Sequence, residues 1–304
     1  MPLSNQEVLR KFIVEGRCRR GSRVFADADD VAVFSYGRHF PLVLKLADGF
    51  LVNGERRSIS TSRHQNLAID VLGREGKRFA VVPFAAIASA LMRQHILSDP
   101  VVPRVRQMMQ IAVPSSGERW HEVEYEKPDG TRSTRMVHTL GDSVLRLGER
   151  YWVSAVDPTG AGRGLYFFTQ LVMRQRPRSV EHALEALKPM AVRQAEQAGA
   201  AVCRQGEWFA IPQKIATPRL MRDVRRGIAV FRRYHVLGRD GHHRLTQAVI
   251  YKHGSKKGWV YARGTMRHTR GEHRMLRLPG WSRIMHGIQR SSYSLPNTGR
   301  LSFD

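Results

Sequence analysis

Cysteine is scarce in this chain: Cys18 and Cys203 are the only two in 304 residues, and no CxxC pair occurs. This excludes a cysteine-only zinc site within one chain and a disulfide framework, and it is typical of a reducing compartment. Long apolar runs are missing too. The longest, from Phe79 to Met92, is too short to cross a bilayer, and the first twenty residues lack the apolar core of a secretion signal. We therefore expect a cytoplasmic protein with no membrane contact.

Signatures of nucleotide and metal chemistry are also missing. The chain contains no GxxxxGK[ST] loop and no HExxH motif. Residues 203–304 hold 7 of the 13 histidines, but only five acidic residues stand near them to complete a ligand shell. The surrounding positive charge also repels divalent cations. We therefore expect no metal site and no cofactor.

Acidic residues are depleted most strongly in the last third of the chain. Residues 203–304 carry 21 Lys+Arg against 5 Asp+Glu, which supplies +16 of the total net charge of +24, while the first 202 residues carry 29 against 21. Arginine makes up 41 of the 50 basic residues, which suits phosphate recognition but also follows from a GC-rich genome. A codon bias toward arginine would not deplete acidic residues in one region of the chain only. The regional imbalance therefore indicates a polyanionic partner, DNA or RNA.

The hydrophobic content of 42% is enough for a real core, and the pattern predicts an α+β protein with a β-rich N-terminal region. Short strands are expected within 31–60, and a meander within 120–173 that includes the hairpin HEVEYEK–PDG–TRSTRMVHTL. The segment 174–179, RQRPRS, is the best linker candidate. We therefore predict a β-rich domain over 1–176 and a basic region of mixed short strands and helices over 177–304.

Within the basic region, TPRLMRDVRRGIAVFRRYHV predicts a helix over 218–234, with Thr217 as its N-cap and Pro218 as its first residue. Apolar residues are expected to line one side of this helix, and arginines to lie away from them on a cationic face. The following QAVIYKHGSKKGWVYARGTMRH predicts two strands joined by a basic turn. The residues predicted to contact phosphates are Arg219, Arg222, Arg226, Arg233, Lys252, Lys256 and Lys257. A second set, predicted to stack on bases or read their edges, is Trp259, Tyr261, Arg263, Arg267 and His268.

Two Arg-His pairs near the other end are candidates for catalysis. Arg38 and His39 lie in SYGRHFP, and Arg63 and His64 lie in SISTSRHQ. The histidines could exchange protons near neutral pH while the arginines hold an anion, as in a phosphodiesterase or nuclease. The structural alternative is that His39 and Tyr36 tie a turn together, and that Thr61 or Ser62 caps a helix starting near His64.

The blocks SYGRHFPL, LVNGERRSISTSRHQ, ALEALKP, RQGEWF and RGTMRH resemble a family of bacterial and phage- or plasmid-borne proteins. That family shows Y-G-x-H-F-P, T-S-x-H-Q and R-Q-G-[DE]-W-F patterns. The blocks are spread over most of the chain, so the resemblance concerns the whole architecture. It implies no activity, because none is established for the family. The chain departs from the pattern after RGTMRH, where TRGE separates His268 from His273 and Ser282 follows Trp281.

Three functions follow from these observations. The first is nucleic-acid binding by the basic region in a bacterial or mobile-element system. The second is a histidine-dependent phosphodiesterase that uses His39 and His64. The third is a phage or plasmid assembly protein whose basic end meets an acidic partner. Charge favours the first.

Overall fold

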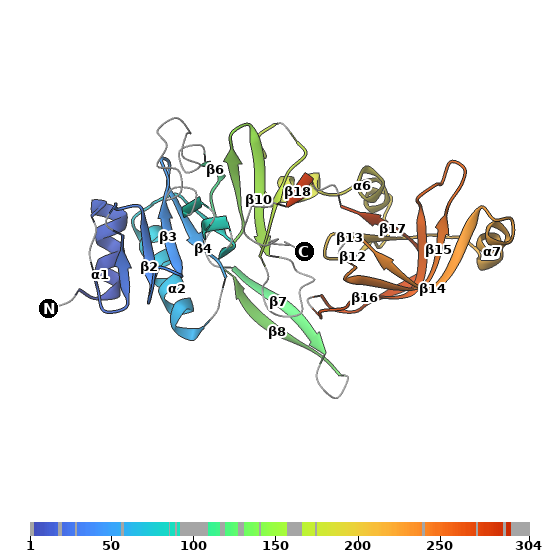
Figure 1. Cartoon of the computed structure of the whole chain (residues 1–304), viewed down its shortest axis with the longest axis horizontal. Helices are drawn as coiled ribbons and strands as arrows, with labels where there is room; N and C mark the ends of the chain where they lie inside the picture. The colour runs from blue at the N-terminus through green and yellow to red at the C-terminus, as the bar shows by residue number, and fades with distance from the viewer. Residues whose placement is uncertain are drawn as a thin grey trace. The chain divides into compact units, whose positions relative to one another are not determined.

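The computed structural model of the chain describes residues 3–17, 20–27, 29–55, 58–84, 86–88, 90–91, 109–115, 119–126, 131–139, 141–156, 166–173, 175–238, 241–271, 273–287 and 290–292. These residues form an α+β protein rich in strands, as predicted (Figure 1). They divide into two compact units. The first holds the described residues up to Ala186 together with 290–292, and the second holds 187–287.

The first unit begins with a five-stranded sheet in chain order (Figure 1). Its strands are β1 (Val24–Ala26), β2 (Ala32–Ser35), β3 (Pro41–Lys45), β4 (Phe50–Asn53) and β5 (Phe79–Val82). All neighbours are antiparallel except β4 and β5, which are parallel and joined by helix α2 (Ile59–Arg74). Helix α1 (Asn5–Arg10) and the π-helical turn η1 (Lys11–Glu15) precede them.

Side-chain alternation gives this sheet two buried faces. Val33, Val43 and Val52 pack with Leu72 of α2 and Phe12 of η1 in one cluster. The intervening residues pack in a second cluster with a second five-stranded sheet. The order of the second sheet is β18-β11-β10-β9-β6, and its strands are β6 (Met109–Val113), β9 (Ser143–Leu147), β10 (Arg150–Val156), β11 (Tyr166–Gln170) and β18 (Arg290–Ser292). The first unit is therefore built in layers.

The predicted hairpin of the first unit is confirmed as β7 (Arg119–Glu126) paired with β8 (Arg132–Thr139). Helix α5 (Val180–Ala186) also belongs to this unit and buries Val180 and Ala183. The NH2 atom of Arg176 donates to the carbonyl of Ala112 at 2.6 Å. Because these contacts hold the segment after 176, the boundary between the units lies at Ala186.

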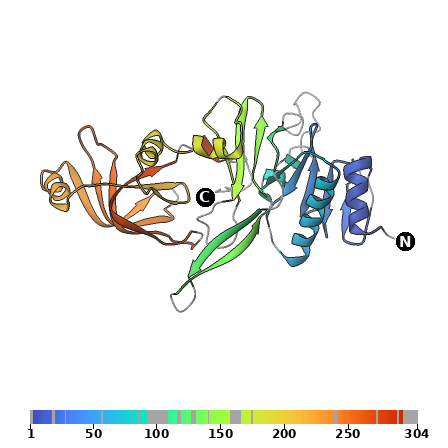
Figure 2. The ribbon, with the colours of Figure 1, turned by 180° about the vertical axis from the view of Figure 1, so that it is seen from behind.

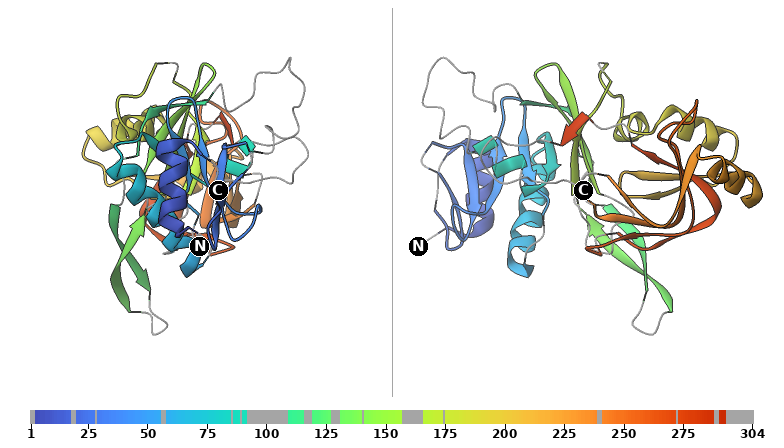
Figure 3. Two further views of the ribbon diagram at one scale, coloured as in Figure 1. Left: turned by 90° about the vertical axis from the view of Figure 1, so that its left-hand side faces the viewer. Right: turned by 45° about the vertical axis from the view of Figure 1, so that its right-hand side comes forward.

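The second unit is one curved antiparallel sheet of six strands in the order β12-β13-β17-β16-β15-β14 (Figures 2 and 3). Its strands are β12 (Cys203–Gln205), β13 (Trp208–Pro212), β14 (Ala229–Leu237), β15 (His243–Tyr251), β16 (Val260–His268) and β17 (Leu276–His286). Helices α6 (Met190–Gln197) and α7 (Thr217–Arg225) accompany them. The predicted basic turn joins β15 to β16, as expected.

The predicted helix over 218–234 is wrong in its second half, and its N-cap is Ala216, one residue before the predicted Thr217. Helix α7 ends at Arg225, and Gly227 follows with φ of +71°. That conformation costs little for glycine and ends a helix. The next residues are β-branched or aromatic at Ile228, Val230 and Phe231, and they continue as the edge strand β14.

The turn PDG at 128–130 of the predicted hairpin lies outside the described residues. No helix in the described ranges is long and apolar enough to cross a membrane.

Candidate nucleic-acid interface

The six-stranded sheet of the second unit has two faces with different cover. On one face, Leu245, Met266 and Ile284 pack with one another and with Trp208. On the other, α7 covers Val249, Tyr261 and Trp281 through Leu220. Helix α6 covers the β13 end of that second face through Val192 and Phe209. Part of the second face is left uncovered, and this part carries positive charge.

The uncovered part is marked by a direct cross-strand pair of arginines. Arg244 of β15 lies opposite Arg267 of β16, and both are exposed. Each stands between buried residues, so alternation turns it away from the apolar side. Val236 of β14 pairs with Arg244 from the other side. We call the set Tyr234, Val236, Arg244, Arg267 and Arg277 the open sheet face.

The remaining members follow from the same register. Tyr234 pairs with Thr246, and Thr265 pairs with Arg277. The two pairs are connected through their threonines: the backbone N–H of Thr265 donates to Oγ1 of Thr246 at 2.8 Å. Tyr234 is 67% exposed, which is unusual for an aromatic side chain in a sheet. The open sheet face therefore combines three arginines with an exposed aromatic ring.

Electrostatics make this arrangement unfavourable by itself. Directly opposed side chains on antiparallel strands have Cβ atoms only about 4.5–5.5 Å apart, and like charges there destabilise the sheet. None of Arg244, Arg267 and Arg277 forms a salt bridge with another residue that the structure describes. Asp223, an acidic residue on α7, instead accepts a hydrogen bond from the Tyr251 hydroxyl at 2.5 Å. The pKa of Tyr251 is raised well above its usual value, mainly by burial and secondly by this hydrogen bond to Asp223.

The residues predicted to contact phosphates are placed on the surface, but in two groups. Arg219, Arg222 and Arg226 are exposed on or just after α7. Lys252 and Lys257 are exposed in the turn between β15 and β16, and Lys256 lies over the rings of Tyr251 and Trp259 at 5.2 and 5.9 Å. Arg233 is exposed on β14 and is not on the helix.

The prediction that ring side chains of the second set stack on bases is wrong for those that are buried. Tyr261 and His268 are each 3% exposed, so neither offers a face to a base. Trp259 is partly buried against α7, and the guanidinium of Arg283 lies 3.5 Å from its ring centroid. Arg263 lies over the ring of Trp281 at 5.2 Å and so shares the face of Trp259 and Tyr261. Of the second predicted set, Arg263 and Arg267 are the exposed members.

Sequence reasoning missed Tyr234, Arg244 and Arg277. Tyr234 was assigned to a helix that ends nine residues earlier, and Arg244 becomes notable only once β14 and β16 are placed beside β15. The available signal was the run AVFRRYHV after Gly227, whose composition favours a strand.

The Arg-His pairs are placed in the first unit, where His64 has a structural environment. His64 is buried on α2, and both ring nitrogens have partners: Oγ of Ser35 at 2.8 Å and Nδ2 of Asn5 at 3.1 Å. Burial, and then the charge of Arg23, lowers the pKa of His64 below its usual value. These contacts join α1, β2 and α2.

His39, Arg38 and Arg63 are exposed. The ring of His39 lies against Gly37 in the turn between β2 and β3. A Cβ atom added at residue 37 would lie only 2.6 Å from Nδ1 of His39. The cap of α2 is Ser58, which exchanges hydrogen bonds with Thr61 in a capping box. The helix therefore begins earlier than the sequence indicated, and His64 lies within it.

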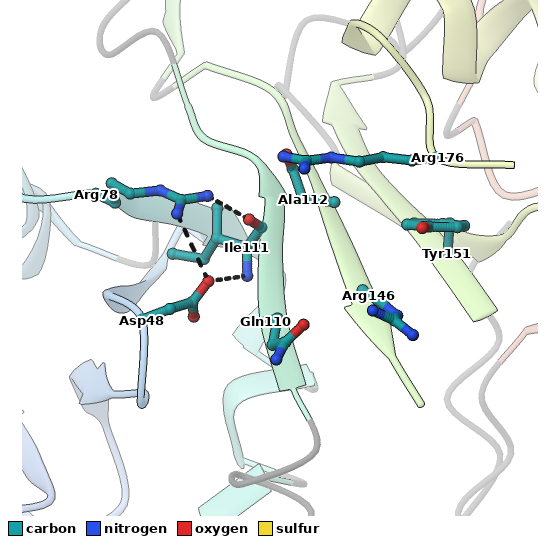
Figure 4. A pocket seen from close by; sticks show the side chains of 8 residues that line it. All are labelled: Asp48, Arg78, Gln110, Ile111, Ala112, Arg146, Tyr151 and Arg176. Carbon is teal, nitrogen blue, oxygen red and sulfur yellow. Dashed lines mark hydrogen bonds and ion pairs between the residues drawn. The ribbon is translucent and has the colours of Figure 1, made fainter. Parts of the chain in front are cut away.

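The first unit also contains a basic pocket lined by Arg78, Arg146, Arg176, Tyr151 and Asp48, among others (Figure 4). Its charged groups hold strand β6 in place. Asp48 accepts from the backbone N–H of Ile111 at 2.9 Å, and Arg78 donates to the carbonyl of the same residue at 2.5 Å. Arg146 donates to the carbonyl of Gly148 at 2.7 Å. The arginines here are engaged with backbone carbonyls, unlike those of the open sheet face.

Three histidines of the second unit meet beneath the open sheet face. His243, His268 and His273 are 0%, 3% and 4% exposed, and one nitrogen of each lies within 4.8 Å of the others. They are the one group among the described residues with the spacing of metal ligands.

Comparisons with known proteins give no further assignment: no family model, no curated protein and no solved structure matches the chain.

Proposed function

We propose that the second unit binds nucleic acid through the open sheet face, assisted by the basic residues of α7 and of the turn at 252–257. The observation that carries this proposal is the Arg244–Arg267 pair. Two exposed, directly opposed cations repel each other, and a phosphate between them converts that repulsion into two charge-assisted contacts. The acid depletion of residues 203–304 supports the same partner.

A single strand fits this surface better than a duplex. An exposed tyrosine beside arginines on a sheet resembles the stacking platforms that bind unpaired bases, where each stacked base contributes about 1–3 kcal/mol. Tyr234 is the described aromatic residue in the second unit with the greatest exposure. In a duplex the bases are already stacked on each other and are not available to its ring.

Fluorescence anisotropy with labelled single-stranded and double-stranded oligonucleotides of equal length tests the proposal. We expect binding to the single strand with an affinity that falls steeply as salt rises, because each neutralised phosphate contributes about −0.7 to the slope for single strands. Polyglutamate serves as the matched polyanion control. Absence of binding by folded protein at low salt would refute the proposal, and equal binding of polyglutamate would favour an acidic protein partner.

A further inference from the structure

The three buried histidines come together through strand pairing. His243 of β15 lies directly opposite His268 of β16, with ring centroids 4.7 Å apart. His273 follows in the segment between β16 and β17, and its ring is 4.9 Å from that of His268 and 5.5 Å from that of His243. The Nε2 atom of each histidine is buried. Three imidazoles therefore converge on one small volume.

All three rings are almost completely buried, at 0%, 3% and 4% exposure, so bulk water has little access to the volume between them. A neutral imidazole presents one nitrogen lone pair, and three converging lone pairs form the donor set of many zinc sites. The region has few carboxylates, but the ligands themselves are histidines, and one of the few carboxylates, Glu207, lies beside His243.

The residues around the histidines support the same geometry. Oε1 of Glu207 lies 3.6 Å from Nδ1 of His243, in the position of the carboxylate that orients a metal-bound imidazole. Gln205, which is 1% exposed, donates to the carbonyl of Met266 at 3.2 Å and to that of Arg274, and so fixes the residues on each side of the cluster. Gly206 leaves room for His273, because a Cβ there would lie 2.9 Å from Nε2.

We infer that His243, His268 and His273 bind one divalent transition-metal ion, for which Zn²⁺ is the best match, with Glu207 beside His243 as the orienting carboxylate. The nitrogens of a tetrahedral zinc site lie about 3.3 Å apart, because Zn–N bonds are about 2.0–2.1 Å long. Small ring movements bring the present separations, all within 4.8 Å, to that value. The ion would join β15, β16 and the segment after β16 directly beneath Arg244 and Arg267.

The test uses the full chain, purified without a histidine tag and analysed for metals by mass spectrometry. We expect about one transition-metal ion per chain, since three histidines hold a single ion. Removal of the ion by a chelator should lower the melting temperature, and Zn²⁺ should restore it. Cobalt added to the stripped protein should give the intense visible absorption of a tetrahedral nitrogen site. Folded, stripped protein that takes up no Zn²⁺ or Co²⁺ would overturn the inference and leave a hydrogen-bonded histidine cluster.

Variants separate the ligands from the other histidines. His268→Gln and His273→Gln should lose the bound metal and the cobalt spectrum, while His253→Gln, which changes an exposed histidine in the basic turn, should keep both. Glu207→Gln should weaken metal affinity about 10- to 100-fold without abolishing binding, as removal of a carboxylate behind a ligand does. Retention of full metal content in a folded double variant, His268→Gln with His273→Gln, would contradict the assignment.

Discussion

Arg244 and Arg267 lie directly opposite each other on adjacent antiparallel strands, exposed and with no acidic partner among the described residues. The fold gains nothing from this pair, since like charges in that register destabilise a sheet by roughly as much as opposite charges stabilise it, about 0.2–1 kcal/mol. The pair lies over three buried histidines and beside an exposed tyrosine. Stability alone would not select such an arrangement, and this is why we propose a bound polyanion at this site.

Arg244→Gln should therefore change stability and binding in opposite directions. Removing one charge relieves the repulsion, so we expect a gain in the free energy of unfolding of about 0.2–1 kcal/mol at low salt. The same change should weaken oligonucleotide binding and lower the magnitude of its salt slope by about 0.7. Urea unfolding and salt-dependent anisotropy measure the two effects. Arg10→Gln, at an exposed arginine of the first unit, is the control and should alter neither the affinity nor its slope.

The double variant Arg244→Gln with Arg267→Gln sharpens the test. The repulsion is already lost in either single variant, so the gains in stability should not add. The losses in binding should also be less than additive, because the two arginines contact the same phosphate. Additive stability gains would show that the two charges do not interact, and they would remove the main support for a phosphate site between them.

Tyr234→Ala should weaken binding to single strands roughly 5- to 150-fold, the equivalent of one stacked base at about 1–3 kcal/mol. Tyr234→Phe should bind nearly as well as the parent protein, because the ring remains and only the hydroxyl is lost. Since the side chain is 67% exposed, neither change should lower the melting temperature appreciably. Anisotropy with a single-stranded oligonucleotide checks this. Equal weakening in both variants would indicate a hydrogen bond from the hydroxyl and not stacking.

The sequence predicted local elements better than it predicted the site. The hairpin of β15 and β16 was predicted correctly, because Gly254 and Gly258 frame a polar turn between two apolar, β-branched runs. Strand β14 was missed, because apolar residues before and after Gly227 happen to continue a helical spacing. The glycine's left-handed conformation ends the helix there. Local pattern cannot decide between these readings, but pairing with β15 does.

The histidine cluster could not be predicted from local sequence patterns, for a different reason. His243 lies 25 residues from His268, and the two meet only through the antiparallel register of β15 and β16. A register change of one residue would turn either ring to the opposite face. Charge counts along the chain do not depend on register, so a polyanionic partner could be proposed from the sequence. The burial of Tyr261 could not be predicted, because alternation assigns a residue to a face but does not show that α7 covers that face.

We expect His64 to make the stability of the first unit sensitive to mild acid. Burial and Arg23 hold its pKa in the folded protein below the unfolded value of about 6.5. The folded state therefore binds fewer protons, and the stability that His64 contributes is fully present above that pH and is lost as the pH falls below it. Urea unfolding between pH 8 and pH 5 should show a loss of at most about 1.4 kcal/mol per pH unit from this group. His64→Gln should show a shallower pH dependence, whereas His39→Gln, at an exposed position, should match the parent protein. A parent-like slope in His64→Gln would assign the acid sensitivity elsewhere.

Gly206 and Gly271 offer a matched test of how tightly the histidine cluster is packed. Both are left-handed, with φ of +56° and +69°, so alanine at either position carries a similar backbone cost of about 1–2 kcal/mol. They differ in their surroundings. A Cβ at residue 206 would meet the ring of His273 at 2.9 Å, whereas a Cβ at residue 271 meets nothing within 4 Å. Gly206 also occupies the first position of the two-residue turn between β12 and β13, where a positive φ is required.

Gly206→Ala should therefore lower the free energy of unfolding by about 1–3 kcal/mol more than Gly271→Ala, the usual cost of overpacking a buried site. Urea unfolding of the two variants under identical conditions measures the difference. Equal losses would mean that the ring of His273 yields freely, and that this histidine is not held in the position the structure gives it.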